Sequence, residues 1–130
     1  MKIKLVLPGS IRSKKNSKRI FARGRFKKVL PSLAYEKWQD EARRYAFFNL
    51  HNNFSFKEPL SCPVNVEAHF YYKGPRPDLS GSLESIGDCL QGILWADDAQ
   101  IESWDGSRMH WDKANPRTEI TVEWDERIEP

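Results

Sequence analysis

The chain has 130 residues, of which 39% are hydrophobic and 30% are charged, and its 21 Lys and Arg outnumber its 18 Asp and Glu. This length suits one domain with a single core, and 5 Trp, 4 Tyr and 7 Phe supply more apolar surface than a disordered chain carries. No apolar stretch approaches the roughly 18 residues of a membrane span, and the start lacks a signal-peptide pattern. The composition therefore argues against membrane-spanning and secreted proteins, and we expect a cytoplasmic one.

The charges are divided unevenly along the chain. Residues 1–31 contain 11 Lys and Arg and no acid, whereas residues 45–130 contain 7 Lys and Arg and 15 Asp and Glu. Such a split indicates that one part of the chain faces a polyanion while another part gathers carboxylates. The alternative is a solvated basic arm that has no partner.

The first half of the chain predicts a strand, a basic arm and a helix. Ile3–Pro8 is a short apolar run that ends at Pro-Gly, which is typical of a strand. Residues 10–31 predict a basic loop or loose hairpin, with a turn at Gly24 and a possible second strand after it. Ser32 is a suitable N-cap for an amphipathic helix over Leu33–Leu50. The apolar positions of that helix recur every three or four residues, at Tyr35, Trp38, Ala42, Tyr45, Ala46 and Leu50.

The second half predicts a strand, a helix and two more strands. Val64–Lys73 alternates and is rich in Val, Phe and Tyr, which favours a strand. A short helix follows, with Gly92 just past its end, and two strands at Ile101–Trp111 and Arg117–Trp124 form a terminal hairpin. The apolar stripe of this helix is Leu83, Ile86 and Leu90. The order β(β)αβαββ predicts a single α+β domain over residues 1–130, with a mixed β-sheet covered by two main helices.

Carboxylates stand at both ends of the second helix, in the stretch RPDLSGSLESIGDCLQGILWADDAQI (residues 76–101). Asp78 precedes the helix, while Asp97 and Asp98 follow it, so the returning chain can bring the acids together. Glu84 and Asp88 lie one turn apart on the polar face of the helix. Clustered carboxylates repel one another unless a cation or protons neutralise them, and oxygen-only ligands suit Mg²⁺ or Mn²⁺. The alternative is that these acids are helix caps, turn residues and a solvated pair.

Other chemistries lack support in the sequence. The three histidines, at positions 51, 69 and 110, are widely separated and have no paired-ligand spacing. No glycine-rich phosphate loop is present, so we expect no nucleotide cofactor. Cys62 and Cys89 have neither metal-ligand nor redox spacing and are expected to be buried, reduced thiols.

The basic arm predicts nucleic-acid binding. Its cations have the chemistry that holds phosphate without reading sequence. Phe21 and Phe26 lie among them and either stack on exposed bases or anchor the arm on the core. We expect DNA contacts from Arg12, Lys14, Lys15, Asn16, Lys18, Arg19, Arg23, Arg25, Lys27 and Lys28, and from Arg76.

These pieces together resemble the RusA-type Holliday junction resolvases, endonucleases of bacteria and their prophages. The segment SKKNSKR is similar to the polar-basic segment that follows the first strand of the family. Residues 76–101 resemble its pattern of Lys/Arg-Pro-Asp, then Asp-x-Leu-x-Gly, then Asp-Asp-x-Gln-Ile. Residues 117–124 resemble its last strand.

The resemblance implies a Mg²⁺- or Mn²⁺-dependent homodimer that cuts two strands of a four-way DNA junction symmetrically, in recombination and repair. Asp78 and Asp98 match the principal metal-binding aspartates of the family, and Asp97 and Asp88 match its further aspartates. Ser80 stands where the family usually has its second aspartate, and Glu84 where it usually has a lysine.

Three interpretations of these departures stay open. Glu84 turns toward the ion as a catalytic replacement for the missing acid; or the site is rearranged around Asp78, Asp88, Asp98 and Glu84; or the site is weakened and the protein is a non-catalytic module that binds branched DNA. An RNA-directed protein and a purely structural protein are further alternatives.

Overall fold

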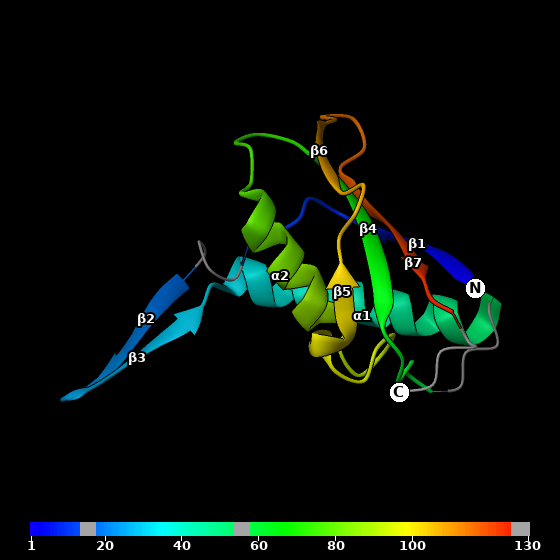
Figure 1. The fold of residues 1–130 in the computed structure, drawn as a ribbon. Helices are drawn as coiled ribbons and strands as arrows, with labels where there is room; N and C mark the ends of the chain where they lie inside the picture. The colour runs from blue at the N-terminus through cyan, green and yellow to red at the C-terminus, as the bar shows by residue number, and fades with distance from the viewer. Residues whose placement is uncertain (14–17, 54–57, 126–130) are drawn as a thin grey trace.

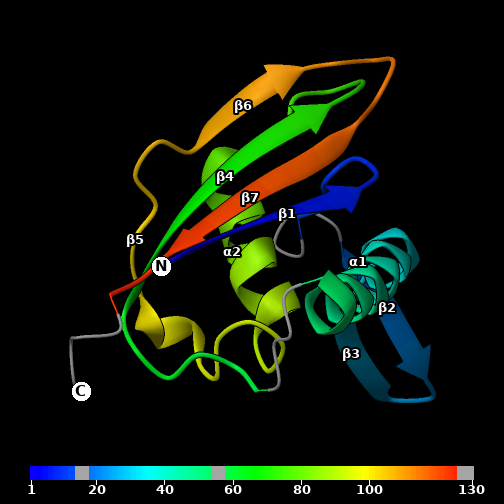
Figure 2. The same cartoon turned by 90° about the vertical axis from the view of Figure 1, so that its right-hand side faces the viewer.

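The computed structural model describes residues 1–13, 18–53 and 58–125 (Figure 1). Two helices cover one face of a main sheet, and a separate two-stranded sheet projects from the body (Figures 1 and 2). The predicted α+β class and mixed sheet are therefore confirmed. Among the helices of these ranges, none combines the length and the apolar character that a bilayer crossing requires.

The elements follow the predicted order with three differences: both arms of the basic segment are strands, a short 3₁₀ helix precedes the predicted strand over Ile101–Trp111, and that strand is divided into two. The helices are α1 (Leu33–Asn53), α2 (Leu79–Leu90) and the short 3₁₀ helix η1 (Asp98–Gln100). The main sheet contains β1 (Lys2–Pro8), β4 (Val64–Tyr72), β5 (Ile101–Ser103), β6 (Arg108–Trp111) and β7 (Arg117–Glu123). The projecting sheet pairs β2 (Lys18–Arg23) with β3 (Phe26–Pro31), and the predicted turn at Gly24 joins them with φ 58.

The main sheet buries only one of its faces. Strand β7 lies between β1 and β4 and runs antiparallel to both, while β5 and β6 follow one another along the other edge of β4 and run parallel to it. Both helices lie on the buried face (Figure 2). The side chains that point into this core are Ile3, Leu5 and Leu7 of β1, Val64, Val66, Ala68 and Phe70 of β4, and Ile120 and Val122 of β7.

The predicted strand over Ile101–Trp111 is interrupted, and the predicted terminal hairpin is wrong. Between β5 and β6 the chain turns away from β4, and side-chain hydrogen bonds replace the backbone hydrogen bonds that would otherwise pair it with β4. Asn65 Oδ1 accepts a hydrogen bond from the Asp105 amide at 3.2 Å, and the Ser107 hydroxyl accepts one from the Ala68 amide at 3.0 Å. Strand β7 pairs with β4 and β1 because its apolar residues gain full burial at the centre of the sheet, which a position beside β6 at the edge would not provide.

Helix α1 forms as predicted and extends three residues further, to Asn53. Ser32 is its N-cap, because the Ser32 hydroxyl accepts a hydrogen bond from the Tyr35 amide at 3.0 Å. The predicted apolar stripe is buried except for Tyr45, which is 42% exposed and lies outside the core.

The C-terminal end of α2 is tied to α1. Gly92 follows the helix with φ 83, as predicted. The Arg43 guanidinium of α1 donates hydrogen bonds to the carbonyl oxygens of Cys89 at 2.7 Å and Gln91 at 3.0 Å, where a cation also complements the helix dipole. Both cysteines are free thiols: Cys62 is half-buried, and burial raises the pKa of Cys89 to about 12.

Candidate active site

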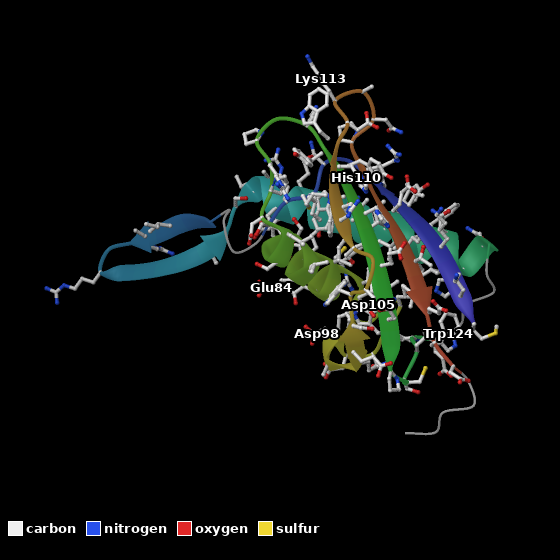
Figure 3. The ribbon with its side chains drawn as sticks, turned by 45° about the horizontal axis from the view of Figure 1, so that its top comes forward. Glu84, Asp98, Asp105, His110, Lys113 and Trp124 are labelled. Carbon is white, nitrogen blue, oxygen red and sulfur yellow. The ribbon has the colours of Figure 1, made fainter. Side chains whose placement is uncertain are left out.

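Helix α2 carries a row of polar side chains on the face that points away from the core. Its opposite face is buried and includes Ile86 and Leu90. Ser80, Glu84 and Asp88 are spaced by four residues and therefore lie on one side of the helix. Figure 3 shows Glu84 projecting from this side.

An open cavity of about 530 Å³ lies between this side of α2 and the segment that contains η1 and β5. Its lining residues are Ser80, Leu83, Glu84, Gly87, Asp88, Asp98, Ile101 and Trp104. The structure thus brings three predicted site residues to one cavity: Glu84, Asp88 and Asp98. The apolar wall opposite them was not predicted, because Trp104 belongs to the turn where one continuous strand was expected.

Asp98 is held at this cavity by contacts of its backbone. Its amide N–H donates a hydrogen bond to Gln91 Oε1 at 2.9 Å. A Cβ atom built on Gly87 would lie 3.7 Å from Asp98 Cβ, so Asp98 packs against the backbone of α2. These contacts place the carboxylate beside the helix.

Asp97, the neighbour of Asp98, caps η1 and does not line the cavity. Its side chain accepts a hydrogen bond from the Ala99 amide at 2.9 Å, and its own amide donates to Gln100 Oε1 at 2.8 Å. The Gln100 amide group also donates to the carbonyl oxygens of Leu60 at 2.8 Å and Cys62 at 3.0 Å. The Asp-Asp-Ala-Gln run is therefore a structural unit in which only its second residue faces the cavity.

The surroundings of Asp98 disfavour its charged form. The side chain of Asp98 is exposed, but neighbouring atoms partly desolvate its carboxyl group, and this desolvation raises the pKa of Asp98. A hydrogen bond with Asp97 and the negative charges of Asp97 and Asp88 raise the pKa further. Among the described residues, no cation forms an ion pair with Glu84, Asp88 or Asp98. The cluster therefore favours the approach of a cation.

The donor set fits a hard divalent cation in chemistry but is incomplete in number. All three side chains offer carboxylate oxygens, which Mg²⁺ and Mn²⁺ prefer. In the described ranges, however, no three His, Cys, Asp or Glu side chains lie close enough to hold a metal ion by themselves. The residues present therefore fit an ion that takes one or two carboxylates and completes its shell with water and substrate phosphate, as Mg²⁺ commonly does.

Asp78 lies apart from this group. It is the N-cap of α2: its Oδ2 accepts hydrogen bonds from the Gly81 amide at 3.0 Å and from the Ser80 hydroxyl at 2.9 Å. Gly87, which contacts Asp98, is nine residues further along the helix, or about 13 Å along its axis. The structure therefore does not bring Asp78 and Asp98 together, and Asp78 lines a different cavity.

The predicted DNA-binding residues are distributed over two surfaces. Arg23 and Arg25 are exposed at the end of the β2–β3 hairpin, and Arg12 and Arg76 line the cavity that contains Asp78. Lys14, Lys15 and Asn16 lie outside the described residues. Only the backbone is described for Lys18, Arg19, Phe21, Phe26, Lys27 and Lys28, so their predicted contacts stay predictions.

Two histidines that are far apart in the sequence meet on the open face of the sheet. Strand β6 pairs with β4 and brings His110 Nε2 to 2.8 Å from His69 Nδ1, while Glu67 Oε2 lies 2.9 Å from His69 Nε2. The same pairing places Lys113 near Lys73, and both line the cavity of Asp78. No local sequence signal indicates these neighbours, because they depend on the register of two strands.

Comparison with known families fits a nuclease site. The family model for the endodeoxyribonuclease RusA matches residues 8–123, which include both cavities. The chain belongs to the RusA endodeoxyribonuclease family. No curated protein matches it in sequence. The RusA family consists of enzymes that cut DNA within a strand.

Within the RusA pattern, the two departures have distinct surroundings. Ser80 uses its hydroxyl on Asp78, so the usual second carboxylate is replaced by a hydrogen-bond donor. Glu84 lines the same cavity as Asp88 and Asp98, so a carboxylate stands where the family usually has a lysine. Three acids therefore line the cavity, Glu84, Asp88 and Asp98, and the first of them stands at a position that departs from the family pattern.

Proposed function

We propose that this protein is a Mg²⁺- or Mn²⁺-dependent endonuclease that cuts four-way DNA junctions. The observation that supports it is the convergence of Glu84, Asp88 and Asp98 on one cavity in a chain of the RusA family. Asp88 and Asp98 would hold the cation, and Glu84 would accept a proton from the attacking water at its carboxylate. The ion, when bound, supplies charge neutralisation at phosphate and a lowered pKa of bound water.

Asp78 has a positioning role in this proposal. Its hydrogen bond with the Gly81 amide fixes the first turn of α2, and this turn sets the direction of the side that carries Glu84 and Asp88. Asp78→Asn keeps an oxygen acceptor for the cap and is expected to reduce cutting less than Asp98→Asn does.

A homodimer would explain paired cuts. A four-way junction has two equivalent strands, and a two-fold symmetric dimer presents the same site twice. Light scattering at micromolar concentration tests this part of the proposal, and a monomer that still makes paired cuts would contradict it.

A second function has support from the incomplete ligand set: a module that binds branched DNA without cutting it. No group of three metal ligands is present in the described part of the chain, and the second family aspartate is Ser80. The two functions differ in their dependence on divalent ions.

The deciding experiment uses an end-labelled four-way junction and a linear duplex of the same sequence, each with Mg²⁺, Mn²⁺ or EDTA. We expect symmetric nicks in the junction only, which disappear with EDTA and in Asp98→Asn. Glu41→Gln, an exposed acid on α1, is the matched control and should cut normally. Tight junction binding without nicks under either ion would favour the binding module, and preference for an RNA junction in competition would exclude both.

A further inference from the structure

A second open cavity, of about 560 Å³, lies at the N-terminal end of α2. Three segments that are distant in the sequence contribute its polar side chains: the stretch after β1, the connection from β4 to α2, and the connection from β6 to β7. These side chains are Arg12, Ser13, Lys73, Arg76, Asp78 and Lys113. Figure 3 shows Lys113 at the end of the sheet where the connection to α2 begins.

The cavity is strongly basic. Four cations and one carboxylate line it, and that carboxylate belongs to Asp78, whose Oδ2 already accepts hydrogen bonds from Ser80 and Gly81. Among the described residues, none of the four cations has an ion pair or a hydrogen bond to a protein group. All four cations are exposed, and their combined charge would attract an anion into the cavity.

Ser13 is a buried donor without a partner at this cavity. The residue is only 8% exposed, and its Oγ is buried with no hydrogen-bond partner among the described residues. It lies against the first turn of α2, because a Cβ atom on Gly81 would be 2.5 Å from it. A buried hydroxyl without a partner is costly, and an acceptor oxygen in the cavity would satisfy it.

We propose that this cavity binds one phosphate group of the DNA backbone, beside the phosphate that enters the acidic cavity. Four cations and a buried hydroxyl are groups that recognise a phosphate. The Asp78–Ser80 hydrogen bond separates the two cavities, since Asp78 lines one and Ser80 the other. The inference rests on the proposed function in that DNA is the ligand.

Seating a neighbouring phosphate would decide which bond is cut. A strand carries a phosphate at every nucleotide, so one strand can occupy both cavities. The basic cavity would hold one phosphate, and a phosphate further along the same strand would then lie at Glu84, Asp88 and Asp98.

The first test measures junction binding in EDTA, where no cutting occurs. Ser13→Ala should lower affinity about tenfold through the lost hydrogen bond to a charged group, and its thermal stability should stay equal or rise because an unsatisfied hydroxyl is removed. The double variant Lys73→Gln/Lys113→Gln should lower affinity at least tenfold and reduce the slope of log K against log salt by about one, since one phosphate contact is lost. The double variant Lys2→Gln/Lys37→Gln removes two exposed cations elsewhere and is the matched control.

The second test replaces single backbone phosphates near the junction centre with neutral methylphosphonates. One position should weaken binding of the natural protein and leave binding of Lys73→Gln/Lys113→Gln unchanged, because the contact is already absent there. A flat scan, or equal affinities of Ser13→Ala and the control, would overturn the proposal. Inorganic phosphate is titrated in parallel: if it binds the natural protein tightly and Ser13→Ala does not, while the scan is flat, then the cavity serves a small phosphate and not DNA.

Both tests are independent of catalysis. A protein that never cuts but shows the position-specific loss would refute the proposed nuclease and support the phosphate site. A protein that cuts normally but shows no position-specific loss in the methylphosphonate scan would support the proposed nuclease and refute the phosphate site.

Discussion

Ser80 donates a hydrogen bond from its hydroxyl to Oδ2 of Asp78 at 2.9 Å, although each residue lines a different cavity. Ser80, one of the two residues that depart from the RusA pattern, is therefore the contact between the two proposed halves of the site. The Ser80 hydroxyl supports Asp78, the N-cap of α2. Because the family usually has an aspartate at this position, the acidic cavity lacks the carboxylate that this aspartate would contribute.

Restoring an aspartate at this position should strengthen metal binding. In Ser80→Asp the donor to Asp78 is lost and a charge is added beside Glu84, so the metal-free variant should be less stable by about 1 kcal/mol. Mg²⁺ should recover more stability in this variant than in the natural protein, as measured by thermal unfolding with and without the ion. Ser80→Asn is the uncharged control; an equal response to Mg²⁺ in all three proteins would remove the acidic cavity as the metal site.

Removing the charge of Asp98 should stabilise the metal-free protein. The folded pKa of Asp98 is raised, so ionisation of this carboxyl costs folding free energy once the pH exceeds that pKa. Asp98→Asn should therefore have a higher melting temperature than the natural protein at neutral pH, and the difference should vanish under acidic conditions where Asp98 is protonated. Addition of Mg²⁺ should raise the melting temperature of the natural protein only. A lower melting temperature of Asp98→Asn at neutral pH would contradict the unfavourable charge cluster.

Gly81 is required by the close approach of Ser13. Alanine normally favours a helix over glycine by about 1 kcal/mol, yet a Cβ atom here would lie 2.5 Å from Ser13 Oγ and 3.3 Å from Ser13 Cβ. Gly81→Ala should therefore destabilise the protein by about 1–2 kcal/mol in urea unfolding. Ser13→Ala in the same chain should recover part of the loss, and additive effects of the two changes would show that the residues do not touch.

His110 should make stability depend on pH in weakly acidic solution. Its pKa is lowered by desolvation and then by the charges of His69 and Arg108. Because the unfolded chain binds this proton more readily, the contribution of His110 to stability is present above its ordinary pKa of about 6.5 and is lost as the pH falls through the folded pKa. The charged groups around it are Glu67, His69, Arg108, Arg117 and Glu119, and Tyr71 stacks on its ring.

Thermal unfolding between pH 5 and pH 8 checks this expectation. His110→Gln should flatten the decline below pH 6.5, whereas Lys2→Gln, a charge change on β1 at the far edge of the sheet, should keep it. An unchanged decline in His110→Gln would show that another group causes it.

Local signals predicted most of the fold. The Ser32 cap, the Gly92 stop and the alternation of β4 lie within a few residues of the structure they specify, and all three are confirmed. The interruption between β5 and β6 was missed because it depends on Asn65, a residue about 40 positions earlier. The placement of β7 was missed because several antiparallel partners were compatible with its pattern.

The candidate site was predictable where helical periodicity determines it. Glu84 and Asp88 had to share one side of α2, and Asp98 had to return near the end of that helix. The separation of Asp78 from Asp98 follows from the length of α2, which brackets the acids instead of joining them. Lys113 carried no sequence signal, since only the tertiary fold brings it to the cavity that Ser13 lines.

The β2–β3 hairpin forms a sheet of its own, paired with no strand of the main sheet in the described structure. A lone two-stranded hairpin is only marginally stable in water, so its predicted contacts with DNA would consume part of the binding free energy in ordering it. Affinity can then be tuned without altering any contact to DNA, through the preorganisation of the hairpin alone. A turn such as Asn-Gly in place of Gly24-Arg25 would act in this way, and the arm becomes an adjustable module whose changes leave the core and the acidic cavity untouched.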